Sequence, residues 1–181
     1  TKVLLYVGRL SPEKELHVLI NAFIACQDHQ TKPMCLVIVG DGPEREKLQR
    51  LAQGYRVIFM GSLSGIALSE AYASADAFVF PSQVETFGNV VLEAMASGLP
   101  VVAYDKACAH QYVRMGHTGW LADLGQLTQF SELIKMLPAR EILKTMGIQA
   151  QVDVQHVGWK HPVQQFEQAL YSVARRSIAP S

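Results

Sequence analysis

The chain has 181 residues, of which 49% are hydrophobic and 18% charged, and its 16 basic residues balance its 16 acidic residues. This composition predicts one soluble globular domain with a substantial core, without an internal repeat or a dividing linker. The charge balance argues against a nucleic-acid partner, and the sequence contains neither a run of about 18 apolar residues for a membrane span nor a signal-peptide pattern.

Short apolar runs alternate with helical periodicities along the chain. The apolar runs predict strands at 3–7, 35–39, 57–60, 77–80, 100–103 and 119–121. The periodicities predict helices at 12–29, 43–53, 66–75, 88–97, 127–136 and 139–149. A final amphipathic helix is expected where apolar residues recur at spacings of three and four, at Trp159, Val163, Phe166, Leu170 and Val173.

The alternation of strands and helices predicts an α/β fold with a Rossmann-like, doubly wound parallel sheet of about six strands. The loops that follow the strands then meet at one edge of the sheet, where such folds bind their ligands. This edge would carry four residues that each follow a predicted strand, namely Arg9, Gly40, Gly61 and Glu85. We therefore expect the functional site there.

The first of these loops carries two cations. Ser11 and Pro12 are typical of an N-cap and a first helical residue, which places Lys14 near the third position of a helix. Because cations oppose the macrodipole at a helix N-terminus, Arg9 and Lys14 suggest a site for an anion such as a diphosphate. The alternative is an ordinary solvated turn with two surface cations.

Two glutamates stand eight positions apart around Gly88. Glu85 falls in the loop after the fourth predicted strand, and Glu93 falls in the second turn of the helix that opens near Gly88. Both can point into the space above the strand's carboxyl end, where a polyhydroxylated ligand would find two acceptors. Asn89, Glu93 and Ser97 form a polar stripe on this otherwise apolar helix. The alternative is that the stripe faces water.

The glycine pattern does not favour a dinucleotide site. Gly40 and Gly42 follow a strand, but Arg45 stands where G-x-G-x-x-G requires its third glycine, and no G-x-x-x-x-G-K-[ST] occurs. A nicotinamide-dependent dehydrogenase therefore ranks third among the functions considered.

The three cysteines, Cys26, Cys35 and Cys108, form no C-x-x-C pair, which predicts reduced thiols rather than disulfides. Cys108 is expected in a loop of the site. His156 and His161 have ligand-like spacing but no further ligands nearby in the sequence, so no metal site is assigned.

Five segments carry a family resemblance: VGRLSPEK at 7–14, VGDGPE at 39–44, FMGSL at 59–63, PSQVETFGNVVLEAMASGLPVVA at 81–103 and GHTGWL at 116–121. Together they resemble the C-terminal donor-binding domain of the retaining GT-B glycosyltransferases of family 4, called the glycosyl transferases group 1. The long segment is the most specific. The resemblance implies that residues 1–181 are one donor-binding domain, half of a GT-B fold, with the N-terminal acceptor-binding domain absent from this sequence.

The resemblance implies a site for a nucleotide-diphosphate sugar. In this interpretation Arg9 and Lys14 hold the diphosphate, Glu93 accepts hydrogen bonds from the ribose, and Glu85 contacts the donor sugar. The backbone of Phe87, Gly88 and Asn89 approaches the diphosphate, and residues 60–63 lie along the base. The full set of implied donor contacts is Gly8, Arg9, Lys14, Gly61, Leu63, Glu85, Phe87, Gly88, Asn89, Val90 and Glu93.

The family mechanism implies retaining transfer of a hexose without a metal or another cofactor, with Arg9, Lys14 and Glu85 as the catalytic residues. In this mechanism the acceptor attacks the donor sugar from the front side as the diphosphate leaves, through an oxocarbenium-like transition state. Arg9 and Lys14 would stabilise the charge that develops on the leaving diphosphate, while Glu85 steadies or orients the sugar.

The sequence departs from the family pattern in the loop after the fifth predicted strand and at Glu15 and His17, where a glycine and an aspartate are common. Residues 106–111 replace a glycine pair and a glutamate, so a sugar contact from His110 or Gln111 and a solvated loop both stay open. Glu15 stands where a glycine often follows the phosphate lysine. We interpret Glu15 as a tolerated change on a helix surface.

The favoured function is thus the donor half of a glycosyltransferase, which binds a UDP-, GDP- or ADP-sugar and is inactive alone. The acceptor, a lipid, glycan or small molecule, would bind through the absent N-terminal domain. A cytoplasmic location is expected, with contact at the inner membrane surface through that domain left open. The alternative is a nucleotide-sugar epimerase or a non-catalytic nucleotide-sugar-binding subunit of the same fold.

Overall fold

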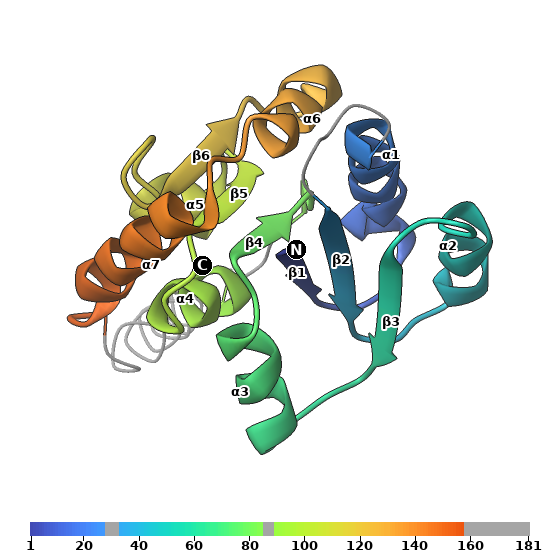
Figure 1. The fold of residues 1–181 in the computed structure, drawn as a ribbon, viewed down its shortest axis with the longest axis horizontal. Coiled ribbons are helices and arrows are strands. Elements are labelled where there is room, and N and C mark those ends of the chain that lie inside the picture. Colours follow the sequence, from blue (N-terminus) through green and yellow to red (C-terminus); the bar gives the residue numbers. More distant parts are fainter. Residues whose placement is uncertain (28–32, 85–88, 158–181) are drawn as a thin grey trace, which may run out of the picture.

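A computed structural model describes residues 1–27, 33–84 and 89–157. Its centre is a six-stranded parallel sheet in the order β3-β2-β1-β4-β5-β6 (Figure 1). The strands are β1 (Lys2–Val7), β2 (Met34–Val39), β3 (Val57–Gly61), β4 (Ala77–Phe80), β5 (Val101–Tyr104) and β6 (Gly119–Ala122). The prediction of six parallel strands is confirmed.

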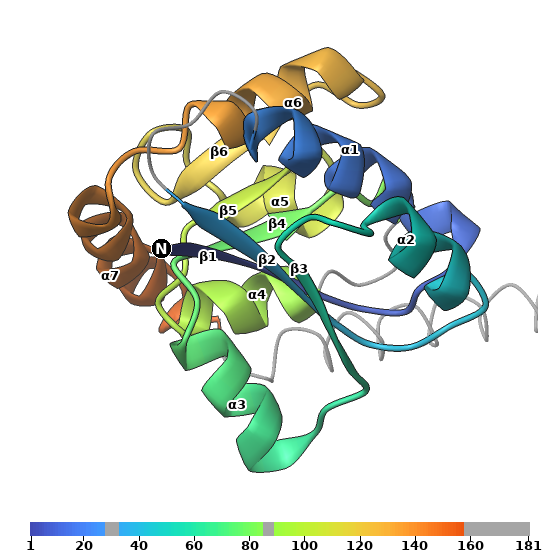
Figure 2. The ribbon, with the colours of Figure 1, turned by 45° about the vertical axis from the view of Figure 1, so that its right-hand side comes forward.

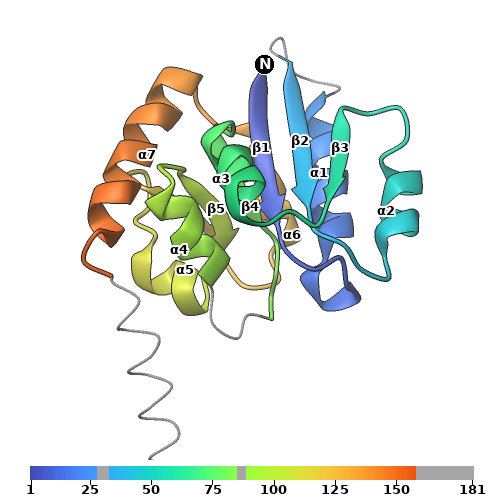
Figure 3. The same ribbon diagram turned by 90° about the horizontal axis from the view of Figure 1, so that it is seen from below.

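Helices cover both faces of the sheet. One face carries α1 (Leu16–Gln27), α2 (Arg45–Leu51) and α6 (Leu127–Lys135) (Figure 2). The other carries α3 (Gly65–Ala73), α4 (Asn89–Ala96), α5 (Ala107–Tyr112) and α7 (Arg140–Val154), which Figure 3 shows on the opposite side of the strands. With both faces covered, all four residues of β4 and of β5 are buried, as expected for central parallel strands.

The core is centred on neighbouring strands β1 and β4. The ring centroids of Tyr6 and Phe80 lie 5.9 Å apart, and those of Phe78 and Phe80 also lie 5.9 Å apart. The direction of chain progression reverses between β1 and β4, since β2 and β3 lie on one side of the pair and β5 and β6 on the other. Ligands of doubly wound sheets bind in the crevice at such a reversal, beyond the carboxyl ends of the strands.

The structure corrects two of the predicted elements. The expected helix over 12–29 begins as a separate 3-10 turn, η1 (Pro12–Lys14), and α1 starts only at Leu16, because Glu15 between them is left-handed with φ 50°. In the segment 106–111, left open as a solvated loop, Lys106 is instead the N-cap of α5 and residues 107–111 form most of that helix. Cys108 is therefore buried in a helix rather than placed in an active loop.

The remaining predicted helices lie close to their expected ranges, although α2 begins at Arg45 rather than at 43. The final helix predicted from Trp159 onward lies outside the described residues, as does the end of the predicted helix over 12–29. In the part of the chain that the structure describes, no helix combines the length and apolar character that a membrane crossing requires.

Candidate functional site

The ends of β1, β2 and β3 are joined by backbone hydrogen bonds at the carboxyl edge of the sheet. The Gly8 amide donates to the Val39 carbonyl at 3.0 Å, and the Gly40 amide donates to the Gly61 carbonyl at 2.8 Å. Gly40 has φ 136°, and a Cβ at this position would overlap the carbonyl oxygen of Gly8. Glycine is thus needed at Gly40 both for its backbone angle and for the close approach of the two turns. These contacts fix where Gly8 and Gly61 lie.

Lys14 bridges the turn after β1 to the loop after β4. Its ammonium donates to the carbonyl of Val84 at 3.0 Å and lies 5.7 Å from the ring centroid of Phe80. The Ser82 hydroxyl donates to the same carbonyl at 2.7 Å. The loop after β1 was predicted to lie close to the loop that leads to Glu85, and Lys14 makes such a contact.

The predicted N-cap position of Ser11 and first helical position of Pro12 are confirmed, and Lys14 is the third residue of that helical turn. The turn is the separate 3-10 turn η1 rather than the first turn of α1, and the Ser11 hydroxyl caps no backbone amide but donates to Glu13 Oε1 at 2.6 Å. The pKa of Glu13 is lowered, chiefly by the Ser11 hydrogen bond and further by the charges of Arg9 and Lys14. The two cations therefore share one neighbourhood, in which the Arg9 side chain is exposed.

Glu93 faces a neighbouring helix. It lies in the second turn of α4, is half-buried, and its Oε2 accepts a 3.1 Å hydrogen bond from the hydroxyl of Tyr72 on α3. Asn89 and Ser97 are exposed, so the predicted polar stripe is not one continuous solvated surface. Tyr72 is 3% exposed. Burial, together with the charge and hydrogen bond of Glu93, raises the pKa of the Tyr72 hydroxyl, which keeps it a donor.

A second lysine reaches the same loop from the other side. Lys106, between β5 and α5, donates to the Gln83 carbonyl at 2.7 Å. His110 pairs through Nδ1 with Asp105 Oδ1 at 2.6 Å. The two strands that flank β4 are β1 and β5. The lysine that follows each of them thus donates to a carbonyl at the start of the loop after β4, Lys14 to Val84 and Lys106 to Gln83.

The described residues place part of the predicted site. Gly61 is buried with φ 73°, Leu63 is half-buried against the core, and Val90 is half-buried on α4. The predicted contacts Glu85, Phe87 and Gly88 lie outside the described residues. The roles assigned to these three residues stay predictions.

Sequence reasoning missed Tyr72 and Lys106. Lys106 lies two residues after the end of β5, as Arg9 lies two residues after β1, so the rule that selected Arg9, a polar residue just after a strand, would also have selected it. No comparable pattern marks Tyr72, because its contact with Glu93 joins residues 21 positions apart on two helices. Only the packing of α3 beside α4 reveals it.

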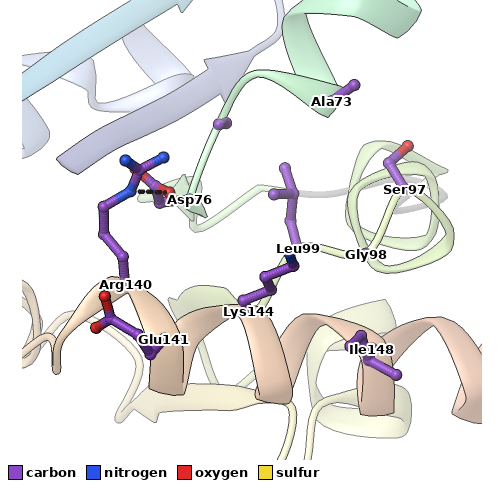
Figure 4. A pocket seen from close by; sticks show the side chains of 10 residues that line it. Ala73, Asp76, Ser97, Gly98, Leu99, Arg140, Glu141, Lys144 and Ile148 are labelled. Carbon is purple, nitrogen blue, oxygen red and sulfur yellow. Dashed lines mark hydrogen bonds and ion pairs between the residues drawn. The ribbon is translucent and has the colours of Figure 1, made fainter. Parts of the chain in front are cut away.

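A groove of about 610 Å³ lies at the opposite edge of the sheet, between α3, the turn after α4, and α7 (Figure 4). Asp76, just before β4, accepts hydrogen bonds from Arg140 Nε and from the Val3 amide, each at 2.7 Å. Both oxygens of its carboxylate are thereby used in joining α7 to the amino end of β1. This structural role gives no reason to place the donor site there.

No group of three or more His, Cys, Asp or Glu residues that could hold a metal ion occurs within 1–27, 33–84 and 89–157. What those ranges offer is the two cations Arg9 and Lys14, which follow β1, and on α4 the half-buried carboxylate of Glu93. Such a set suits a ligand that carries both phosphate and hydroxyl groups.

A model of the family described as glycosyl transferases group 1 matches residues 1–151. The chain belongs to this family. It is 35% identical over 176 residues to the sulfoquinovosyl transferase SQD2 of Arabidopsis thaliana, and the aligned region covers 95% of this chain and 34% of SQD2. It is 47% identical over 119 residues to a GDP-mannose-dependent alpha-mannosyltransferase of Mycolicibacterium smegmatis, covering 66% of this chain and 30% of that one. This glycosyl transferases group 1 chain thus spans about a third of these curated relatives.

The Rossmann-like α/β fold of this group 1 chain matches solved GT-B glycosyltransferase structures. HepE of Anabaena, crystallised with UDP and glucose, matches with a TM-score of 0.74 and 28% identity over 94% of this chain and 48% of HepE. TarM of S. aureus matches with a TM-score of 0.81 over 94% of this chain and 35% of TarM. At 19% identity, the TarM match shows the fold alone.

Proposed function

We propose that this chain is the donor-binding half of a retaining glycosyltransferase, in which Arg9 and Lys14 bind the diphosphate of a nucleotide sugar. The observation that carries the proposal is the contact between Lys14 and the loop after β4, which brings a cation to the chain reversal between β1 and β4. Family membership supports the class of reaction.

The contacts of Lys14 leave it able to bind phosphate. An ammonium has three hydrogen-bond donors, and one of them is directed at the Val84 carbonyl. Two remain for phosphate oxygens, and the exposed guanidinium of Arg9 adds a second positive charge. When the bond between the sugar and the diphosphate breaks, negative charge grows on the leaving group. Fixed cations stabilise that charge more than they stabilise the bound donor.

Glu93 is the proposed partner of the nucleotide's ribose. Its half-buried carboxylate lies in the second turn of α4, whose first residue, Asn89, adjoins the predicted phosphate-binding turn. Glu85 is proposed to contact and orient the sugar, without acting as a nucleophile. Transfer would proceed with retention and without a metal, to an acceptor held by the N-terminal domain.

Two of the compared proteins suggest which nucleotide donors to test first. HepE was crystallised with UDP, and the mannosyltransferase relative is named for its dependence on GDP-mannose. A UDP- or GDP-hexose is therefore the first donor to test, and an ADP-sugar the next. An acceptor lipid, glycan or small molecule would bind elsewhere, and the protein would work in the cytoplasm or at the inner membrane surface.

The proposal is tested by calorimetric titration of the chain with UDP, GDP, ADP and NAD. We expect one nucleoside diphosphate to bind and Lys14→Ala to weaken it by about 1.5–3 kcal/mol, the range for hydrogen bonds to charged groups. Lys47→Ala is the control, because Lys47 is an exposed cation on α2 paired with Glu44. Binding of NAD alone, or unchanged binding by Lys14→Ala, would contradict the proposal.

A further inference from the structure

The side chain of Glu93 is held in place by a residue from another helix. Tyr72 lies at the end of α3, and its hydroxyl donates to Glu93 Oε2 at 3.1 Å. Its ring packs against Phe78 of β4, with centroids 6.1 Å apart and planes at 41°. Because the ring is buried between a helix and the sheet, the hydroxyl has little freedom to move.

The Tyr72 hydroxyl is not explained by packing alone. A phenylalanine would fill the same volume, and the hydroxyl's hydrogen bond to Glu93 is its contact within the described part of the chain. Tyr55, by contrast, is 38% exposed, so its hydroxyl can be satisfied by water. Burying a phenol costs free energy unless it finds a partner. The arrangement therefore points to a role in which Tyr72 serves the carboxylate.

One hydrogen bond leaves the other carboxylate oxygen for a ligand. Glu93 Oε2 accepts from Tyr72, and no other described residue donates to Oε1. A glutamate side chain has several freely rotating bonds, and restricting them on binding opposes affinity. A carboxylate already held by a buried donor avoids much of that loss.

We infer that Tyr72 is a positioning residue for recognition of the nucleotide's ribose: it orients Glu93 so that Oε1 meets a ribose hydroxyl. This inference rests on the proposed function, since it assigns a ribose to the site. It makes a specific distinction between ligands. The hydroxyl of Tyr72 contributes to the affinity for a diphosphate that carries ribose hydroxyls and contributes nothing to one that lacks them.

The test compares UDP or GDP, whichever binds, with the 2′,3′-dideoxy form of the same diphosphate. The full chain is titrated as wild type, Tyr72→Phe, Glu93→Ala and the double variant. We expect Tyr72→Phe to lower affinity for the ribose form by roughly three- to tenfold, the net effect of one typical hydrogen bond, and to leave the dideoxy form unchanged. In the Glu93→Ala background, which lacks the acceptor, Tyr72→Phe should add no further loss.

Tyr55→Phe is the matched control and should change neither affinity. Because both ligands are measured on the same preparation, partial misfolding of Tyr72→Phe would lower both affinities together and could not imitate the expected result. An equal loss for the two ligands, no loss for either, or a further loss in the Glu93→Ala background overturns the positioning role. If the wild type binds neither diphosphate, or binds the dideoxy form as well as the ribose form, the proposed ribose site itself fails, and the inference with it.

Discussion

At the scale of single residues, Glu15 has a conformation that its side chain opposes. It sits between η1 and α1 with φ 50° and ψ 35°, a left-handed geometry that costs free energy for any residue with a Cβ. One of its carboxylate oxygens, Oε2, is also buried without a hydrogen-bond partner among the described residues. The interpretation of Glu15 as a change on a helix surface is therefore wrong. It occupies the bend that separates Lys14 from α1.

Glu15→Gly should stabilise the chain. Glycine adopts left-handed angles freely, and the substitution removes the unpaired buried oxygen, so we expect the free energy of unfolding to rise by about 1 kcal/mol. Urea unfolding, followed by circular dichroism, measures this change.

The control for this prediction is the same substitution in a regular helix. Glu46→Gly lies in α2, where glycine is expected to lower the free energy of unfolding by about 1 kcal/mol. If both substitutions destabilise the chain equally, Glu15 is not under backbone strain.

At the scale of elements, the turns after β1, β2 and β3 form one unit through glycine contacts. Gly40 lies where β1 and β2 approach too closely for a side chain, and its amide continues the contact to Gly61. The position of the Gly8–Arg9 turn therefore depends on a residue of another loop. Stability and donor binding should be coupled through this contact.

Gly40→Ala should lower the free energy of unfolding by about 2–4 kcal/mol, because backbone strain and overlap with the Gly8 carbonyl both oppose it. Gly65→Ala is the matched control: Gly65 has φ 55°, but a Cβ there would meet nothing within 4 Å. It should show only the smaller cost of the backbone angle. Equal losses in the two variants would mean that the contact with Gly8 contributes nothing.

The sequence allowed most elements to be predicted, because apolar runs such as those of β4 and β5 are buried on both faces and need no partner to be recognised. It did not predict α5, since its six residues are too few to show a helical period. The bend at Glu15 was missed for a different reason. Ser11 and Pro12 are typical of a helix start, and the left-handed angle three residues later is visible only in the structure.

The candidate site was predictable where its residues follow strands, as with Arg9 and Lys14. Glu93 was predicted from its place on the helix after Gly88, but its contact with Tyr72 was not, because strand-end rules say nothing about helix packing. Lys106 lies between these cases: it follows a strand, yet its contact with Gln83 depends on the neighbouring loop.

At the scale of the whole molecule, the proposed leaving-group stabilisation depends on side-chain cations. Arg9 and Lys14 supply two positive charges at the reversal between β1 and β4. If they are sufficient, the affinity for the nucleoside diphosphate should change by less than about twofold between EDTA and millimolar magnesium, a difference well below 1 kcal/mol. Loss of binding in EDTA with recovery on adding magnesium would show that a metal takes part.

The account's central claim is that the diphosphate binds at the carboxyl edge of the sheet, between Arg9 and Lys14, with the ribose on Glu93. The most direct measurement is a crystal structure of the chain with the nucleoside diphosphate that binds in titration. We predict the diphosphate within hydrogen-bond distance of the Lys14 ammonium and a ribose hydroxyl on the Glu93 carboxylate. A diphosphate bound at the opposite edge, in the groove beside Asp76 and Arg140, would contradict the account.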